Sequence, residues 1–390
     1  MPKEAQSCKR FNGYKPCFGD HNCWEDGCKD HIPVGAKILI INLDAMGDVV
    51  MTTARLPGLK RKFPDSTIYW ITLKIAAPLL QNNPLIDKVL PYDFESLSIL
   101  QSMEFDYVMC SDKSQRSCAI LNLVPGKHKL GFGLDPNGKI IPLNKGAEYN
   151  FRLGMDDHFK FRENTRTGQD YLAETFEIDF VNDEYILNLS EQEIAYFHEY
   201  RQKVKISEDD FVIGFNTGCS ELFPNKKMTV EQHQNLLYSF LKYPDVKIAL
   251  FGGPEDTQRN LQIAAPFGDK VINTPSTDGV RKGIVYENLA DVVITGDSFG
   301  MHLAIGLKKF VIAWFGLSCW TEIDLYGRGV KLFPEDLFCA PCWKKSCPYN
   351  LECIQMIDLD RIVNETMNYY NSGAWKEAKN LNQAYLKKDS

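Results

Sequence analysis

The chain has 390 residues, of which 44% are apolar and 12% aromatic, a composition typical of a globular protein long enough for two domains. Its formal net charge of −7 argues against the basic surface by which proteins bind nucleic acid, so we expect no nucleic-acid partner and at most peripheral membrane association. The N-terminus has no apolar signal-peptide region and no apolar run reaches the length of a membrane span, which predicts a cytoplasmic protein.

The first half of the chain predicts a parallel sheet. Lys37–Leu43 is a continuous apolar run, as expected of a strand buried on both faces, and similar runs recur at 66–73 and 105–112. Helix-like segments at 76–83 and 117–124 alternate with them, and this βαβαβ order is typical of parallel strands joined by crossovers. The more polar, irregular stretch from Asp156 to Asp183 is either a substrate loop or a solvated connection.

The second half predicts another unit of the same kind. Ser190 and Glu193 have capping-box spacing, so we expect a helix to start there and to serve as a hinge. Strand-like runs at 211–218, 246–253, 291–297 and 309–316 then alternate with helix-like segments at 229–241, 255–265, 281–290 and 301–307.

The predicted fold class is therefore α/β, with two Rossmann-like doubly wound domains facing across a cleft. The expected divisions are a Cys-rich segment 1–34, a first domain 35–190, a second domain 191–360 and a helical segment 361–390. Ligands of open parallel sheets bind outside the carboxyl ends of the strands, so we expect the chemistry where those ends meet.

Three motifs at strand ends of the second half indicate a nucleoside diphosphate. After the first strand, Thr217 and Gly218 offer hydroxyl and backbone donors, and Lys226 or Lys227 can bind a diphosphate, although an ordinary loop explains the motif equally well. After the second, Gly252–Gly253 allows close backbone approach and the acid that follows, Glu255 or Asp256, can bind a ribose, unless the segment is only a turn.

The third motif, "TGDSFGMHLAIG", is the most specific. Ser298 and the N–H groups of Phe299 and Gly300 can bind phosphate at a helix N-terminus, with His302 one turn further in and Asp297 just before the helix. The alternative is that Asp297 is an N-cap and His302 a core residue. The sequence lacks GxxxxGK[ST] and GxGxxG fingerprints, which counts against an NTPase or a standard dinucleotide oxidoreductase and favours a nucleotide sugar as ligand.

A carboxylate in the first βα turn, Asp48 of "AMGDVV", suits a different role, since it would repel a phosphate there. Facing the anomeric carbon of a sugar held by the second half, it can act as general base toward an acceptor hydroxyl, and a single displacement then inverts that centre. The alternatives are that Asp48 only caps the following helix, or that Asp44 is the base.

Together, these residues resemble glycosyltransferase family nine, the bacterial ADP-heptose-dependent heptosyltransferases. The resemblance runs from about residue 37 to residue 370 and rests on "MGDVV", "NTG…NKKMT", "GGPED" and "TGDSFGMHLA". It implies a GT-B fold, ADP-heptose as donor, inversion, and no catalytic cofactor or metal. It also implies that Asp48 is the base and that the diphosphate and donor sugar are bound by Thr217, Lys226, Asp297, Ser298 and His302.

The resemblance leaves the acceptor open. A hydroxyl of a bacterial surface glycan, such as lipopolysaccharide core, is expected, either free or lipid-linked, and a protein acceptor is the alternative. We expect the acceptor near residues 156–170, which carry Arg162 and Arg166. Another nucleotide sugar as donor, or a non-catalytic sugar-nucleotide-binding protein, are the remaining alternatives; nothing in the sequence supports an epimerase or a phosphorylase.

Eight of the twelve cysteines form two clusters, which in a reducing compartment indicate metal ligands more readily than disulfides. The second cluster has the compact spacing C-x2-C-x4-C-x5-C, which predicts a closed, structural zinc or iron site. The first is looser, with His21 or His31 as possible replacement ligands, and is either a second metal site or a set of unlinked cysteines. The clusters comprise Cys8, Cys17, Cys23 and Cys28, and Cys339, Cys342, Cys347 and Cys353.

Overall fold

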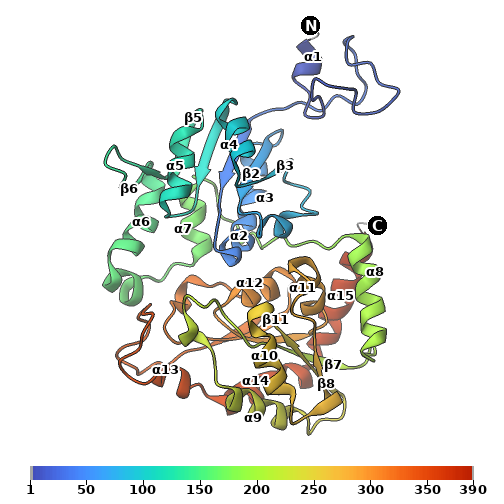
Figure 1. Ribbon diagram of the computed structural model, residues 1–390, viewed down its shortest axis with the longest axis vertical. Helices are drawn as coiled ribbons and strands as arrows, with labels where there is room; N and C mark the ends of the chain where they lie inside the picture. Colours follow the sequence, from blue (N-terminus) through green and yellow to red (C-terminus); the bar gives the residue numbers. More distant parts are fainter. Residues whose placement is uncertain (1–2, 389–390) are drawn as a thin grey trace.

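The computed structural model describes residues 3–388, with side chains described up to residue 381. The outermost residues of the two predicted terminal segments, 1–2 and 389–390, lie outside this range. Two six-stranded sheets lie one above the other, with strand orders β3-β2-β1-β4-β5-β6 and β12-β11-β10-β7-β8-β9 (Figure 1). Neighbouring strands are parallel except for the antiparallel pair β5 and β6.

The N-terminal lobe is built on the first sheet. Its strands are β1 (Lys37–Ile41), β2 (Thr67–Thr72), β3 (Lys88–Pro91), β4 (Phe105–Cys110), β5 (Gly126–Leu134) and β6 (Ile140–Pro142). Its helices are α2 (Met46–Thr52), α3 (Leu56–Lys62), α4 (Phe94–Gln101), α5 (Gln115–Leu123), α6 (Glu148–Met155) and α7 (Gly168–Thr175), and a short α1 (Lys3–Gln6) lies before the sheet.

The C-terminal lobe is built on the second sheet. Its strands are β7 (Phe211–Asn216), β8 (Val246–Phe251), β9 (Val271–Asn273), β10 (Val292–Gly296), β11 (Phe310–Trp314) and β12 (Gly329–Leu332). Its helices are α8 (Glu191–Lys203), α9 (Val230–Phe240), α10 (Thr257–Ala264), α11 (Val280–Glu287), α12 (Phe299–Gly306), α13 (Glu352–Gln355), α14 (Leu359–Ser372) and α15 (Ala374–Lys388).

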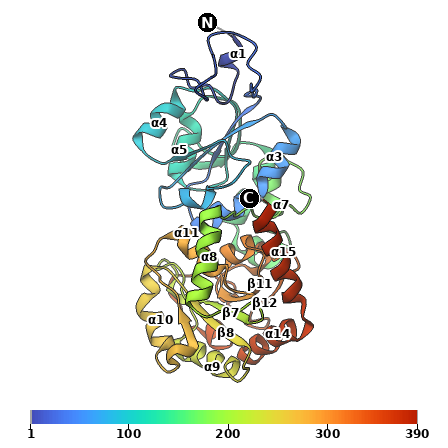
Figure 2. The same cartoon turned by 90° about the vertical axis from the view of Figure 1, so that its right-hand side faces the viewer.

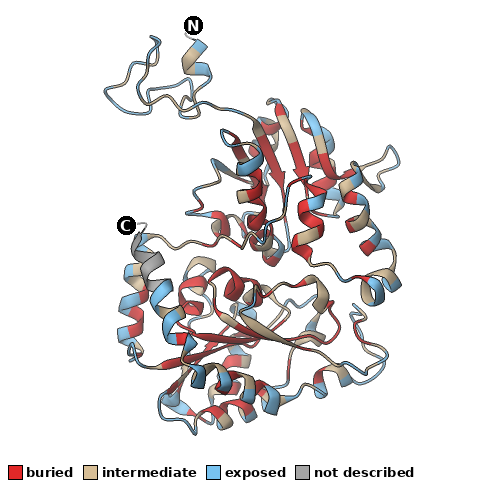
Figure 3. Ribbon diagram, turned by 180° about the vertical axis from the view of Figure 1, so that it is seen from behind, coloured by how far each residue is buried: buried red, intermediate tan, exposed pale blue. Residues whose placement is uncertain are grey.

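The central strands are buried on both faces, which explains why the sequence shows them as continuous apolar runs (Figure 3). Every strand expected from an apolar run is present, in β1, β2, β4, β7, β8, β10 and β11. The short or edge strands β3, β6, β9 and β12 were not predicted, because each has at most one buried residue. β5 has four consecutive buried residues but was also not predicted, because Lys127, His128 and Lys129 and its three glycines leave no apolar run in its sequence.

Two local expectations were wrong. The segment 76–83 contains only a 3-10 turn, Ala77–Leu80, because the backbone becomes extended at Gln81 and Asn82 has a positive φ of 60°, neither of which continues a helix. The stretch from 156 to 183 is not irregular throughout: it holds a π-helical turn at Phe159–Glu163 and the helix α7, whose capping box is formed by Thr167 and Asp170.

The connection between the lobes runs through residues 178–190, which have no regular secondary structure. α8 begins after Ser190 with the predicted capping box, and then packs on the C-terminal lobe, where the rings of Tyr200 and Tyr286 are 4.7 Å apart. The predicted terminal helical segment is two helices separated by Gly373, and Trp375 of the second packs 5.2 Å from Phe211 of β7 (Figure 2).

The Cys-rich N-terminal segment projects from the end of the N-terminal lobe that is remote from the second sheet (Figures 1 and 2). Lys9 attaches it to the lobe by bonds to the carbonyl of Ser66 at 2.7 Å and to Asp87 at 3.0 Å. Within residues 3–388, none of the helices combines the length and the apolar character needed to cross a membrane.

Candidate active site

Two βα turns from different lobes meet at the carboxyl ends of the sheets. α2 follows β1, α12 follows β10, and the two helices lie against each other (Figure 1). Gly47, in the first turn of α2, makes the close approach: a Cβ added to it would lie 2.5 Å from the Cδ2 of His302 in α12. Because open parallel sheets bind ligands at this edge, the junction is the candidate site.

Asp48 lies in this junction and is open to solvent. It occupies the third position of α2, where its Oδ2 accepts a hydrogen bond from the N–H of Ala45 at 3.3 Å. Although it is accessible, loss of solvation between the lobes raises the pKa of the Asp48 carboxyl group, and Asp297 raises it further; His302, the Ala45 N–H and Lys226 act in the opposite direction. The capping role and an accessible carboxylate therefore coexist in one residue.

The alternative base, Asp44, is placed differently. Its carboxylate pairs with Arg116 of α5, with 3.0 Å between Nη2 and Oδ2. This ion pair directs Asp44 toward the neighbouring crossover helix of its own lobe, whereas Asp48 is close enough to Lys226 and His302 of the other lobe to interact with them electrostatically.

The C-terminal lobe contributes a buried ion pair. Lys226, in the turn after β7, bonds through its Nζ to the Oδ2 of Asp297 at 2.6 Å. Burial by itself would raise the pKa of Asp297, but Lys226, His302 and the nearby Ser318 hold it below its usual value, so the carboxyl group is ionised. The ammonium group of Lys226, which already bonds to Asp297 at this strand end, can also bind an anionic ligand such as a phosphate group there.

His302 lies beneath this pair, within α12. Burial lowers the pKa of its imidazole, against the opposing effect of Asp297 and Asp48, and Nδ1 lies 3.4 Å from the hydroxyl of Tyr185. The two rings stack with 6.0 Å between centroids. Tyr185 comes from the connection between the lobes. His302, a residue of the C-terminal lobe, therefore contacts both this connection and Gly47 of the N-terminal lobe.

The start of α12 has the features expected of an anion site. Ser298 is the N-cap, yet its side chain makes no capping bond and lies 3.3 Å from the hydroxyl of Thr295. Phe299 packs partly into the core, and Gly300 contacts Asn216 so closely that an added Cβ would be 2.3 Å from its Cγ. The first N–H groups of α12 and the Ser298 hydroxyl are thus at the junction beside Asp297.

The remaining predicted donor residues lie further along the sheet, at the ends of β7 and β8. The Thr217 hydroxyl is buried and donates to Asn260, and Gly218 abuts Asp256, whose Oδ1 would be 2.0 Å from an added Cβ. Asp256 is itself buried and accepts from the N–H of Gly253 at 3.1 Å. Of the two acids after Gly-Gly-Pro, only Glu255 is exposed.

Sequence reasoning did not identify several residues at the junction. Tyr185 and Ser318 follow no motif, and Trp343, in the four-cysteine segment, lies with its ring 4.5 Å from the Lys226 Nζ. Asp112, just after β4, accepts from the N–H of Leu43 at 2.6 Å, and burial raises its pKa to about 7. A polar residue directly after a buried strand was the available signal for Asp112.

The C-terminal cysteines come together. Cys339, Cys342, Cys347 and Cys353 line one cavity, together with Asn225 from the turn that carries Lys226. Burial raises the pKa of Cys353 to about 11, and the other three thiols add to this effect because they are close to it. Four convergent thiols suit zinc or iron. In the described chain, however, no three His, Cys, Asp or Glu side chains are arranged so that they could hold an ion, so the metal stays a prediction.

The N-terminal cysteines also share a cavity. It is lined by Cys8, Cys17, Cys23, Cys28 and His31, among others. His21 contacts two residues that line it: its Nδ1 lies 3.6 Å from the Cys17 sulfur and its Nε2 2.9 Å from Asp30. Both histidines considered as replacement ligands are therefore at the cluster, His31 in the cavity lining and His21 in contact with Cys17.

The two arginines expected near an acceptor have protein partners. Arg162 donates to the carbonyl groups of Ala340 at 2.9 Å and Phe338 at 3.0 Å, across the lobe boundary. Arg166 pairs with Glu174 at 2.6 Å. The segment therefore connects the N-terminal lobe to the four-cysteine segment, and Arg162 has a structural role that the sequence did not predict.

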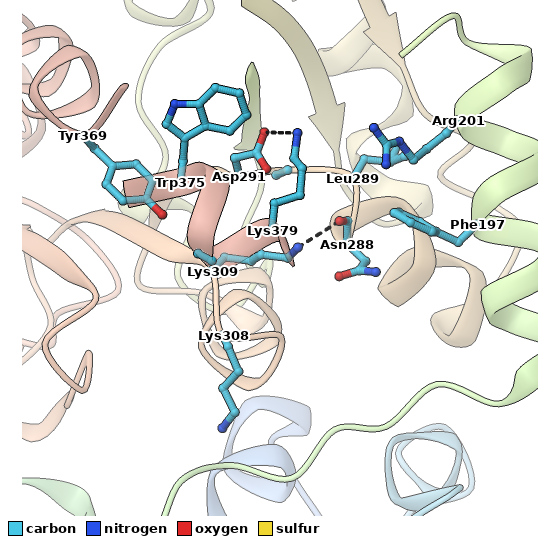
Figure 4. A pocket seen from close by; sticks show the side chains of 12 residues that line it. Phe197, Arg201, Asn288, Leu289, Asp291, Lys308, Lys309, Tyr369, Trp375 and Lys379 are labelled. Atoms are coloured by element: carbon cyan, nitrogen blue, oxygen red, sulfur yellow. Dashed lines mark hydrogen bonds and ion pairs between the residues drawn. The ribbon is translucent and has the colours of Figure 1, made fainter. Parts of the chain in front are cut away.

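A third cavity lies at the opposite end of the strands of the C-terminal sheet, between α8, α15 and the starts of β10 and β11 (Figure 4). Its lysines already have partners: Lys379 pairs with Asp291 at 3.1 Å and Lys309 donates to the carbonyl of Asn288 at 2.9 Å. Asp291 and Lys309 precede their strands, so the cavity lies at the amino ends, away from the edge that binds ligands.

Comparison with known proteins places the chain in a family. The profile of glycosyltransferase family 9 (heptosyltransferase) matches residues 97–352, more than half of the chain. The chain belongs to this family. Lipopolysaccharide heptosyltransferase 1 of Campylobacter coli is 25% identical over 307 residues, which are 72% of this chain and 84% of that protein. The predicted family and enzyme class, a glycosyltransferase, are thereby confirmed.

Solved structures agree on the architecture. Escherichia coli ADP-heptose lps heptosyltransferase II is 17% identical, with a TM-score of 0.63 over 88% of this chain and 99% of that one. The iron-containing dodecameric glycosyltransferase TibC of enterotoxigenic E. coli H10407 is 11% identical, with a TM-score of 0.51 over 86% of this chain and 77% of that one. The two-sheet, GT-B-like fold is thus confirmed.

Proposed function

We propose that this protein transfers heptose from ADP-heptose, with inversion, to a hydroxyl group of a bacterial surface glycan. The observation that carries the proposal is the junction itself: an accessible carboxylate of one lobe, Asp48, faces a lysine and a helix N-terminus of the other. Family membership and the names of the relatives, lipopolysaccharide heptosyltransferase and ADP-heptose lps heptosyltransferase, support this donor and this class of acceptor.

In the proposed reaction the acceptor oxygen attacks the anomeric carbon while the bond from that carbon to the diphosphate oxygen breaks. Asp48 takes the proton of the attacking hydroxyl group, and ADP leaves with the bonding electron pair. Lys226 and the N–H groups at the start of α12 stabilise the charge that develops on the diphosphate, so the step needs no covalent intermediate and no catalytic metal. The exposed acid Glu255 is proposed to bind the ribose.

The acceptor is proposed to approach from the N-terminal lobe. Lys113 follows β4 there, and loss of solvation lowers its pKa to about 8, with Lys160 lowering it further and Glu322 and Asp48 opposing. These charged groups make the surface next to Asp48 polar, which supports the approach of a hydroxyl-rich acceptor there.

Mass spectrometry of products formed from a panel of ADP- and UDP-sugars, with lipopolysaccharide-core fragments as acceptors, tests the assignment. A product that gains one heptose from ADP-heptose is expected. Products only from UDP-hexoses would replace the donor assignment. Tight ADP-heptose binding without transfer to any glycan or peptide, and without slow hydrolysis, would favour a non-catalytic sugar-nucleotide-binding protein.

We also propose that Cys339, Cys342, Cys347 and Cys353 bind one structural zinc or iron ion. Their shared cavity and the iron of TibC support this proposal. Elemental analysis of the purified protein is expected to find about one equivalent that Cys342→Ser removes and that the N-terminal variant Cys17→Ser does not. Purified protein that contains no metal, and whose melting temperature does not change when zinc or iron is added, would contradict the proposal. A second equivalent of metal that is lost in Cys17→Ser would assign another ion to the N-terminal cluster.

A further inference from the structure

The four-cysteine segment reaches into the junction between the lobes. Its residue Trp343 lies with its ring 4.5 Å from the Nζ of Lys226 in the C-terminal lobe and 5.4 Å from the Nζ of Lys160 in the N-terminal lobe. One indole therefore contacts a cation from each lobe. Phe223, in the same turn as Lys226, packs against it with 4.8 Å between the ring centroids.

The backbone holds Trp343 in this place. Its φ of 52° lies in the left-handed region, which a bulky side chain rarely adopts and which usually persists only where the surroundings impose it. The N–H groups of Trp343 and Cys342 both donate to the carbonyl of Leu317, at 2.9 and 3.0 Å. Leu317 precedes Ser318, a buried residue close enough to Asp297 to help lower its pKa, so one loop lies beside both the tryptophan and the carboxylate.

Two further contacts attach the segment to the site. Asn225, the neighbour of Lys226, donates to the carbonyl of Lys345 at 2.8 Å, and Arg162 of the N-terminal lobe donates to Ala340 and Phe338. The segment is thus bonded to both lobes beside the lysine that we assign to the diphosphate.

We propose that Trp343 is a positioning residue for Lys226 in the binding of a nucleoside diphosphate. The electron-rich face of an indole attracts an ammonium group without neutralising it, unlike a carboxylate. When a diphosphate binds, Lys226 has to direct a proton donor toward it as well as toward Asp297. Trp343 restricts the ammonium group to the region between the two anions and shields it from water. This inference rests on the proposed function.

A double-mutant cycle on ADP affinity tests it, since ADP binding can be measured without turnover. Trp343→Ala is expected to weaken ADP binding by about 2- to 30-fold, the range of a cation–π contact from exposed to desolvated sites. Because Trp343 acts through Lys226, the same substitution in a Lys226→Met background is expected to cause no further loss. Trp343→Phe is expected to retain part of the affinity. Phe338→Ala, which truncates an exposed ring of the same segment, is the control and is expected to leave the affinity unchanged.

The possible results are distinguishable. An equal loss of ADP affinity with and without Lys226, or no loss with Trp343→Ala, would overturn the positioning role while leaving the proposed function standing. A wild-type protein that does not bind ADP would instead refute the donor assignment. If Trp343→Ala fails to fold, the cycle is run with Trp343→Phe, for which a loss of equal size in both backgrounds has the same adverse meaning.

Discussion

Replacing Asp48 by asparagine separates the two roles that the structure gives this residue. The isosteric amide still has an oxygen that can accept the N–H of Ala45, and the existing bond is long, at 3.3 Å. Even complete loss of this bond would cost at most about 1 kcal/mol, so the stability of the variant is expected to fall by less than that. A missing general base lowers the rate by about 10²- to 10⁴-fold, equivalent to about 3–5 kcal/mol of the activation barrier.

Binding of ADP is expected to persist in this variant and even to tighten, since removing a carboxylate close to Lys226 leaves that cation more available to the diphosphate. Initial rates of ADP release, the melting temperature and the dissociation constant of ADP measure the three quantities. Asp44→Asn is the matched control, because Asp44 pairs with Arg116 instead of facing the other lobe, and its kcat is expected to stay within a few-fold of wild type. The reasoning fails if Asp48→Asn keeps more than about a tenth of the wild-type kcat, or if Asp44→Asn loses as much.

Three further outcomes are expected. Lys226→Met should weaken ADP binding by at least about ten-fold because it removes the cation and leaves Asp297 unpaired, whereas Lys227→Met, whose lysine lies 3.7 Å from Asp256, should change it much less; calorimetry with ADP compares the two. Since the pKa of Asp48 is raised above 3.8, kcat/KM should fall on acidification at a higher pH than for an ordinary aspartate, and an acid limb at or below that value would contradict the assignment. Burial raises the pKa of Glu287 from 4.5 to about 8, so between these pH values the folded protein keeps a proton that the unfolded chain releases. The free energy of unfolding should therefore decrease as the pH rises from 4.5 to 8, by up to about 1.4 kcal/mol per pH unit. Glu287→Gln should remove that decline, which urea unfolding at pH 5 and pH 8 measures; an equal decline in both proteins would show that Glu287 does not cause it.

The sequence was sufficient to place residues whose position depends on their own strand end. Asp48, Asp297 and His302 stand at fixed offsets from buried apolar strands, and a parallel sheet places those offsets at one edge. Even so, their position alone could not separate a cap from a base, because Asp48 has the geometry of a cap and lies open at the junction at once.

Residues whose role depends on contacts between distant segments could not be predicted. Arg162 bonds to Ala340 across 178 positions of the chain, and no periodicity or spacing relates the two. Trp343 lies among cysteines, so that its surroundings suggested only a metal site. The structure shows that the same segment also reaches Lys226.

Gly47 combines both cases: it stands at a fixed offset from its own strand, and it contacts a distant segment of the chain. The residue before the proposed base has to be glycine here, because an added Cβ would be 2.5 Å from the Cδ2 of His302 and 3.1 Å from its Nε2. Since His302 is buried and stacked on Tyr185, it has little freedom to move away, and a larger residue would push α2 and α12 apart. The spacing between Asp48 and the Lys226–Asp297 pair is thus set by one glycine and one histidine, one from each lobe. A transfer reaction that requires the base and the departing diphosphate on opposite sides of one carbon atom depends on that spacing.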